Sequence, residues 1–105
     1  MFVRLTSMSF APAQIEGAKK VYAEEIVPIV RAQQGCLDIM LLEPIVETDE
    51  HISCTMWNSK IDADAYETSG VYQQMVNKLT NSLSGQPKLR SYYVQHARYP
   101  EVPRI

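Results

Sequence analysis

The chain has 105 residues, of which 46% are hydrophobic and 21% charged, and its net charge is −2 at pH 7. This size and composition indicate one globular domain with a modest core, and they exclude an intrinsically disordered chain. No basic stripe is interleaved with aromatic residues, no apolar run is long enough to cross a membrane, and the N-terminus has no signal-peptide pattern, so we expect no nucleic-acid partner, no membrane contact and a cytoplasmic location.

The chain begins with an alternating segment from Phe2 to Phe10, which predicts a strand. Its apolar residues lie on both sides. We expect the side that carries Ser7 and Ser9 to face inward. The other side presents Arg4, Thr6, Met8 and Phe10.

Apolar residues at helical spacing follow Pro12 and continue to Val30, which predicts a helix. Pro28 lies inside this pattern. It predicts a kink near Glu24–Glu25, or a first helix that ends early. Gly35 supplies the helix stop.

Two strands of a hairpin come next. Residues 36–42 form a short apolar run, typical of a strand buried on both faces, and residues 51–57 alternate up to Trp57. With a turn near Thr48–Asp49, Cys54 would lie opposite a residue near Glu43 and far from Cys36. We therefore expect two free thiols.

The last part of the chain predicts two short helices and a strand. Ser59, with Asp62 three residues later, is typical of a helix N-cap. The predicted elements are a helix over 62–68, a helix over 71–83, a strand over 89–99 and an extended tail over 100–105. We therefore expect one domain, residues 1–99, followed by the tail.

The order strand, helix, strand, strand, helix pair, strand predicts an α+β, ferredoxin-like split βαβ fold with a four-stranded antiparallel sheet. Helices cover only one face of such a sheet, yet these strands are apolar on both. The uncovered face predicts a two-fold homodimer that buries Met8 and Phe10 in an interface of more than roughly 2,000 Å², with the tail along the partner.

Several short segments resemble the antibiotic biosynthesis monooxygenase (ABM) family. The segments are Val27–Pro28, Arg31–Cys36, Met56–Ser59 and Ser69–Tyr72. The resemblance spans roughly residues 2–97 and implies a dimeric α+β barrel, in which two ferredoxin-like sheets pack face to face. The family includes cofactor-free monooxygenases of phenols and quinols, heme-degrading enzymes and isomerases of small carbonyl compounds.

The sequence departs from this family at positions that carry chemistry. Many members have a histidine nine residues after the strand tryptophan, where this chain has Tyr66. The three positions that serve heme degradation in the family hold Ser7, Tyr66 and Val76, and valine cannot ligate iron. We therefore expect no heme, no other cofactor and no metal site.

The residues that remain predict a ligand pocket between the first strand and the helix pair. Trp57 and Tyr66 would hold an aromatic ring, and Ser7 and Tyr72 would donate hydrogen bonds to its oxygens. His96 would be the general base, so His96 and Tyr72 are the candidate catalytic residues. Each also has a structural interpretation, as a core aromatic, a self-paired hydroxyl or an interface histidine.

Three functions remain open from the sequence. The first is a cofactor-independent monooxygenase of a small aromatic or quinol-type substrate. The second is a dimer that binds a small apolar or aromatic molecule without turnover, which the missing family histidine favours. The third is an isomerase of a small carbonyl compound.

Overall fold

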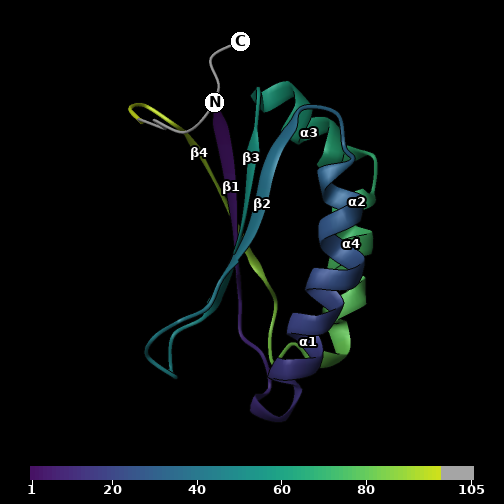
Figure 1. The fold of residues 1–105 in the computed structure, drawn as a ribbon, viewed down its shortest axis with the longest axis vertical. Helices are drawn as coiled ribbons and strands as arrows, with labels where there is room; N and C mark the ends of the chain where they lie inside the picture. Colours follow the sequence, from purple (N-terminus) through teal and green to yellow (C-terminus); the bar gives the residue numbers. More distant parts are fainter. Residues whose placement is uncertain (98–105) are drawn as a thin grey trace.

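The computed structural model describes residues 1–97, so the predicted tail over 100–105 lies outside the described residues. Four antiparallel strands form one sheet in the order β2-β3-β1-β4. The strands are β1 (Phe2–Met8), β2 (Cys36–Leu42), β3 (His51–Trp57) and β4 (Lys88–Tyr93). The helices lie on one side of this sheet and leave the other side uncovered (Figure 1). The predicted α+β, ferredoxin-like arrangement is confirmed.

The helical layer consists of two rods. The first rod, residues 15–31, follows a 3-10 turn and runs without a break. The second rod, residues 60–82, is broken at Gly70. The segments are η1 (Pro12–Gln14), α1 (Ile15–Val21), η2 (Tyr22–Ile26), α2 (Val27–Arg31), α3 (Lys60–Thr68), α4 (Val71–Leu79) and η3 (Thr80–Ser82).

The first rod contains a π-helical turn, η2, where the sequence predicted an interruption. Pro28 lacks a backbone N–H and its ring crowds the preceding turn, so regular α-helical bonding cannot pass through it. A wider turn just before the proline accommodates this clash. The expected irregularity near Glu24–Glu25 is therefore confirmed.

The corner between β3 and α3 is held by a cap and a close approach. The Ser59 Oγ accepts a hydrogen bond from the Asp62 backbone N–H at 3.2 Å, as the N-cap pattern predicted. Gly35 has φ of 80°, and a Cβ there would collide with the Asp62 side chain. Asn58 N–H donates to the Gly35 carbonyl at 2.9 Å, which ties this corner to the end of the first rod.

Alternate residues of β1 point to opposite sides of the sheet, and the inward set differs from the prediction. Arg4, Thr6 and Met8 are buried beneath the helices, whereas Ser7 lies on the other face. The sequence therefore predicted the wrong face of β1 as the covered one, because it placed Ser7 beneath the helices. Met8 and Phe10 are 3% and 8% exposed within the chain's own core, so they are not free to form a dimer interface.

The face without helices, called the open face here, is largely apolar. Its apolar residues are Val3, Leu5, Met40, Leu42, Ile52, Cys54, Met56 and Tyr92, and the polar residues Ser7, Asp38, Lys88 and Arg90 lie on the same face. Met40 and Leu42 lie on the edge strand β2 and are about 40% exposed, at 38% and 44%. The predicted burial of residues 36–42 on both faces is therefore wrong for the part of the chain that the structure describes, because none of its residues covers this face.

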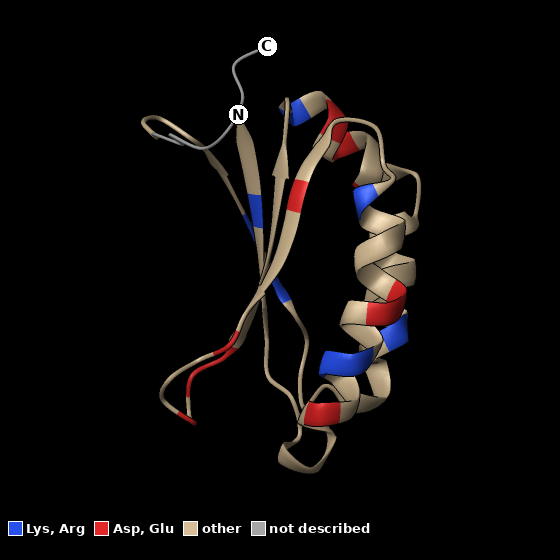
Figure 2. Cartoon of the chain, viewed as in Figure 1, with Lys and Arg blue, Asp and Glu red and all other residues tan. Residues whose placement is uncertain are grey.

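The loop of residues 43–50 joins β2 to β3 and projects away from the helices (Figure 1). Acidic residues gather in it (Figure 2). Cys54 pairs with Met40 rather than with a residue near Glu43, because the hairpin is centred on Glu47 and not on Thr48–Asp49 as predicted. Cys36 pairs with Trp57, and both thiols are free as expected. Within residues 1–97, no helix has the length and apolarity needed to span a membrane.

Candidate functional site

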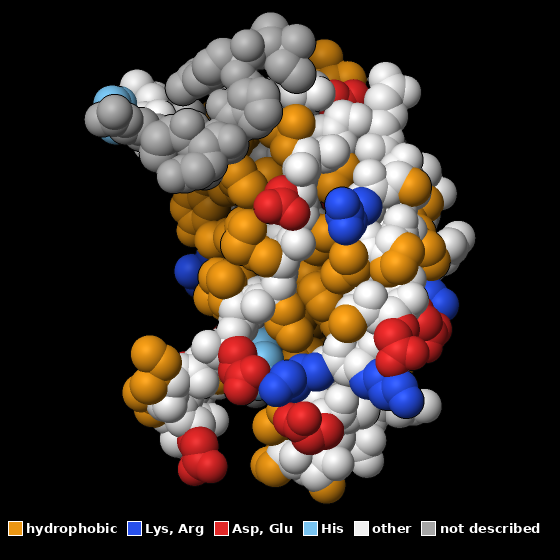
Figure 3. Space-filling view, viewed as in Figure 1, with side chains coloured by type: hydrophobic (Ala, Val, Ile, Leu, Met, Phe, Trp, Pro, Cys, Tyr) orange, Lys and Arg blue, Asp and Glu red, His pale blue; other side chains and the backbone are white. Residues whose placement is uncertain are grey.

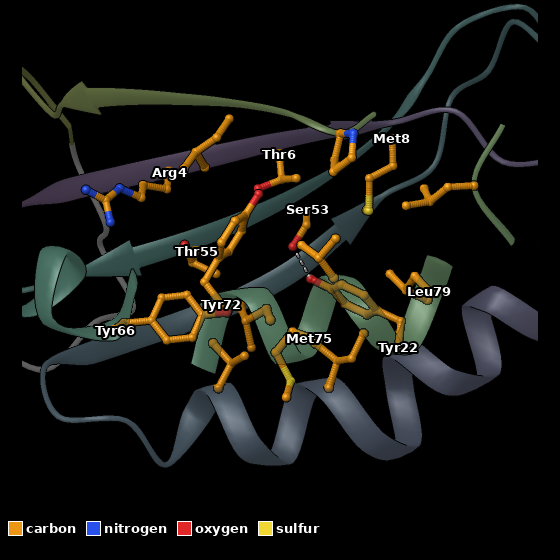
Figure 4. A pocket seen from close by; sticks show the side chains of 17 residues that line it. Arg4, Thr6, Met8, Tyr22, Ser53, Thr55, Tyr66, Tyr72, Met75 and Leu79 are labelled. Atoms are coloured by element: carbon orange, nitrogen blue, oxygen red, sulfur yellow. Dashed lines mark hydrogen bonds between the residues drawn. The ribbon is translucent and has the colours of Figure 1, made fainter. Parts of the chain in front are cut away.

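A cavity of about 40 Å³ lies between the sheet and the helices. Hydrophobic side chains also gather at the surface over the sheet and in the seam beside the helices (Figure 3). Most of the cavity lining is apolar, but six of its residues carry a side-chain hydroxyl (Figure 4). They belong to Thr6, Tyr22, Ser53, Thr55, Tyr66 and Tyr72. Such a mixture of apolar walls and a few polar groups is typical of small-molecule sites.

Tyr22 projects from the π-helical turn onto the sheet. Its hydroxyl lies 2.7 Å from the Ser53 Oγ on β3 and donates to the Met40 carbonyl at 3.1 Å (Figure 4). Burial raises the pKa of Tyr22 to about 12, and the bond with Ser53 offsets a part of that effect. The phenol therefore keeps its proton at neutral pH.

Trp57 lies behind the cavity rather than in its wall. It is fully buried, and its Nε1 donates to the Thr55 Oγ1 at 2.9 Å, so its one polar atom is satisfied. Its indole stacks on the Tyr66 ring with centroids 5.0 Å apart. Trp57 therefore orients Tyr66, and the expectation that it contacts a ligand directly is not met by this arrangement.

Tyr66 and Tyr72 stand beside one another at the cavity, with ring centroids 6.1 Å apart in an edge-to-face arrangement. The Tyr72 hydroxyl points toward Thr6 on β1 (Figure 4). Burial raises the pKa of Tyr66 and that of Tyr72, and the hydrogen bond with Thr6 partly offsets the rise at Tyr72. Both phenols are thus neutral donors at physiological pH and poor proton acceptors.

Arg4 is the charged residue of the cavity wall, and the sequence did not single it out. Its side chain is 8% exposed and is held by hydrogen bonds to the Ala63 carbonyl at 2.6 Å and the Ser91 Oγ at 3.1 Å. It also forms ion pairs with Asp64 and, at 3.2 Å, with Glu67. Its charge is therefore compensated, and its main effect is to fasten β1 to α3.

Comparison with known proteins decides the family. The family model described as antibiotic biosynthesis monooxygenase, ABM, matches residues 1–78. The chain belongs to the ABM family. No curated protein matches it closely enough to count as a relative.

Solved structures of other ABM-like chains have the same fold. A candidate antibiotic biosynthesis monooxygenase of Deinococcus radiodurans superposes with a TM-score of 0.78 at 14% identity, covering 94% of this chain and 97% of its own. A protein of Nitrosomonas europaea with the same description gives 0.76 at 14%, covering 91% and 100%. The heme-degrader MhuD of Mycobacterium tuberculosis, described with two hemes bound in its active site, gives 0.78 at 16%, covering 94% and 100%. Identities this low show a shared fold alone.

Two residues expected in the ABM pocket lie elsewhere. Ser7 lines a separate, shallow depression on the open face, beside Leu42 and Glu50. His96 is exposed and lies beyond the end of β4, which stops at Tyr93 rather than continuing to Tyr99 as predicted. The structure therefore brings Tyr66 and Tyr72 together but leaves Ser7 and His96 outside the cavity.

Most of the hydroxyl-bearing cavity residues that the sequence did not indicate lie on the covered face of the sheet. Thr6, Ser53 and Thr55 belong to the inward side of β1 and β3, which becomes visible only when the covered face of the sheet is known. Tyr22 could have been identified from the sequence, because it is the one large polar aromatic on the buried side of the first rod.

Proposed function

We propose that this ABM protein is a cofactor-independent monooxygenase of a small phenolic or quinol-type aromatic compound. The observation that carries the proposal is that six hydroxyl-bearing residues line a cavity whose other walls are apolar except for the charge-compensated Arg4. Apolar walls accept an aromatic ring, and hydroxyls bind the oxygens attached to it.

The tyrosines would act on the charge that develops on the substrate. In cofactor-free oxygenation the substrate anion itself reduces O2: one oxygen atom enters the substrate, the other leaves as water, and the substrate supplies the electrons. Tyr66 and Tyr72 keep their protons at neutral pH and can donate to a phenolate oxygen. Fixed donors of this kind stabilise an anion most strongly in a dry cavity. Tyr72 is thus proposed as a catalytic residue, and Tyr66 as a ligand-contacting one.

The cavity's lining also favours a second candidate, a dimer that binds such a compound without turnover. No carboxylate and no imidazole are among the described residues of the cavity wall. A general base at neutral pH would have to come from solvent or from the substrate's own acidity. The same absence argues against an isomerase, which must remove a proton from carbon.

The size of the cavity restricts what enters it. Ligand pockets usually measure roughly 300–1,000 Å³, far more than the 40 Å³ observed. An aromatic ligand therefore enters only when lining side chains move. Met75 has an unbranched, adaptable side chain, and Tyr72 is only half-buried, so these two are the residues we expect to move.

The described residues of the cavity do not fit heme, the group bound by MhuD. The lining holds no histidine or cysteine to ligate iron, and Val76 stands where the resemblance placed a ligand. Tyrosinate is the remaining oxygen ligand, but burial raises the pKa of all three lining tyrosines. The proposed reaction therefore uses no step through heme.

We also propose that the protein works as a homodimer joined through the open face. The support is its apolar composition and its exposure in the single chain, with Met40 and Tyr92 at 38% and 46%. A two-fold partner is the simplest cover for such a face. A cytoplasmic location is part of the proposal and is supported by the free Cys36 and Cys54 thiols.

Oxygen uptake tests the reaction. Purified protein is incubated in air with a panel of dihydroxynaphthalenes, and native mass spectrometry is used to detect any co-purified ligand. We expect uptake above the spontaneous rate, and a fall in kcat of about tenfold or more in Tyr72→Phe, since one oxyanion donor is lost. Ile61→Ala is the control, because Ile61 is 79% exposed on α3. Binding with no uptake by any compound would replace the monooxygenase with the non-catalytic binder.

A further inference from the structure

The hydroxyl pair at Tyr22 and Ser53 has a fixed direction of hydrogen bonding. The Tyr22 Oη lies within hydrogen-bond distance of two partners, the Met40 carbonyl at 3.1 Å and the Ser53 Oγ at 2.7 Å. A phenol carries one proton, so it can donate to only one of them. A carbonyl oxygen can only accept.

Only one assignment satisfies both bonds. Tyr22 donates to the Met40 carbonyl, and the Ser53 hydroxyl donates to the Tyr22 Oη. The Tyr22 proton remains in place at neutral pH, because burial raises the pKa of this phenol to about 12. The proton of Ser53 is therefore directed away from any ligand.

Ser53 also lines the cavity, and what it offers there is its remaining lone pairs (Figure 4). We propose that Ser53 is a specificity-determining residue that accepts a hydrogen bond from a ligand O–H and rejects a carbonyl or ether oxygen, and that Tyr22 is the positioning residue that imposes this direction. The inference deepens the proposed function and rests on it.

The cavity thus has hydroxyls of opposite character. Ser53 presents an acceptor, whereas burial raises the pKa of Tyr66, so this phenol keeps its proton and can donate it to a ligand. A mono-deprotonated quinol has one O–H and one O⁻ on the same ring system. This class of ligand matches both groups, with its O–H at Ser53 and its oxyanion at the tyrosines.

The test uses a matched pair of ligands, 1-naphthol and 1-methoxynaphthalene. Both present a ring and an oxygen acceptor, but only the naphthol can donate. Dissociation constants are measured by equilibrium dialysis for the wild type, Tyr22→Phe and Ser53→Ala, with circular dichroism to check folding. Tyr22→Phe keeps the ring and removes only the hydroxyl, so Ser53 regains its proton for the ligand.

We expect the wild type to bind the naphthol about five- to tenfold more tightly than the ether, the range of one neutral hydrogen bond. In Tyr22→Phe the ratio should fall below about twofold, because Ser53 can then donate to the ether oxygen. Ser53→Ala should also lose the preference. The added methyl group is the competing explanation, and it would leave the ratio unchanged in Tyr22→Phe.

The outcomes separate the inference from the proposed function. Equal affinities in the wild type, or a ratio that survives Tyr22→Phe, would overturn the hydrogen-bond direction while the cavity stands. If neither compound bound to any of the three proteins, the cavity would be overturned as a ligand site, and the inference with it.

Discussion

The two faces of the sheet are built from alternate residues of the same strands, yet they have different chemistry. The face beneath the helices carries paired polar groups, such as Ser53 with Tyr22 and Thr55 with Trp57. The open face carries mainly aliphatic and sulfur-containing side chains, and none of the residues 1–97 covers it. A shift of one residue along a strand therefore separates a side chain that serves the site from one that serves assembly.

The largest expected effect compares neighbours on the two faces of β3. Trp57→Ala should lower the free energy of unfolding by about 3–5 kcal/mol, because it removes a fully buried indole and leaves a cavity behind. Met56→Ala, on the open face, should cost less than Trp57→Ala, because Met56 is only partly buried within its own chain. Urea denaturation measures both. Similar losses for the two variants would mean that the open face is packed as tightly as the core.

Assembly should respond to the open face alone. Cys54→Glu places a charge among Leu5 and Met40 and should raise the dimer dissociation constant about 100-fold or more, since a two-fold interface would bury two like charges. Light scattering over a dilution series measures it. Ile61→Glu, at an exposed position on α3, is the control. If the wild type were monomeric at high protein concentration, the dimer proposal would be wrong.

Ligand binding should respond to the covered face alone. Thr6→Leu fills the cavity and should weaken binding of 1-naphthol about tenfold or more, whereas Ser7→Leu should leave the dissociation constant within about twofold. Equilibrium dialysis reports both values. If Ser7→Leu proved the more damaging change, the assignment of the two faces would be reversed.

The smallest expected effect is a pH dependence of stability. Tyr22 has a pKa of about 12 in the folded chain against 10.0 unfolded, so the unfolded state loses this proton first. Its contribution to stability is complete below pH 10 and is lost as the pH rises toward 12. Between pH 9 and pH 11 this group should remove about 1.4 kcal/mol. Urea denaturation of Tyr22→Phe should show a correspondingly smaller fall, and an identical fall would contradict the assignment.

Local signals predicted the elements well because they act over a few residues. The Ser59 cap, the break at Gly70 and the disturbance before Pro28 follow from backbone geometry that the residue type dictates. Their positions in the structure agree with the sequence.

The candidate site was harder to predict because β1 is apolar on both sides. Val3 and Leu5 alternate with Phe2 and Met8, so the period of two does not reveal which side the helices cover. Because the wrong side was chosen, the sequence placed Ser7 in the pocket, where the structure has Thr6.

Two further misses have different causes. Arg4 would ordinarily be placed in solvent. Its partners, among them Asp64 and Glu67, are far away in the sequence, and they make its burial tolerable. The last strand stops at Tyr93 although the alternation continues, so His96 was carried too far. Contacts between distant segments, which a single sequence does not show, decide both.

The π-helical turn has a consequence for the phase of the first rod. Its buried residues, Ala18, Tyr22, Ile26 and Val30, recur every four positions. In a regular α-helix each such step overshoots a full turn by about 40°, so the row would drift about 120° around the axis across three steps. The wider turn at η2 absorbs part of this drift, which keeps Tyr22 and Val30 facing the same sheet. Deleting one residue there would regularise the helix and change the spacing of the buried row to four, three and four residues, so both halves would still face the sheet.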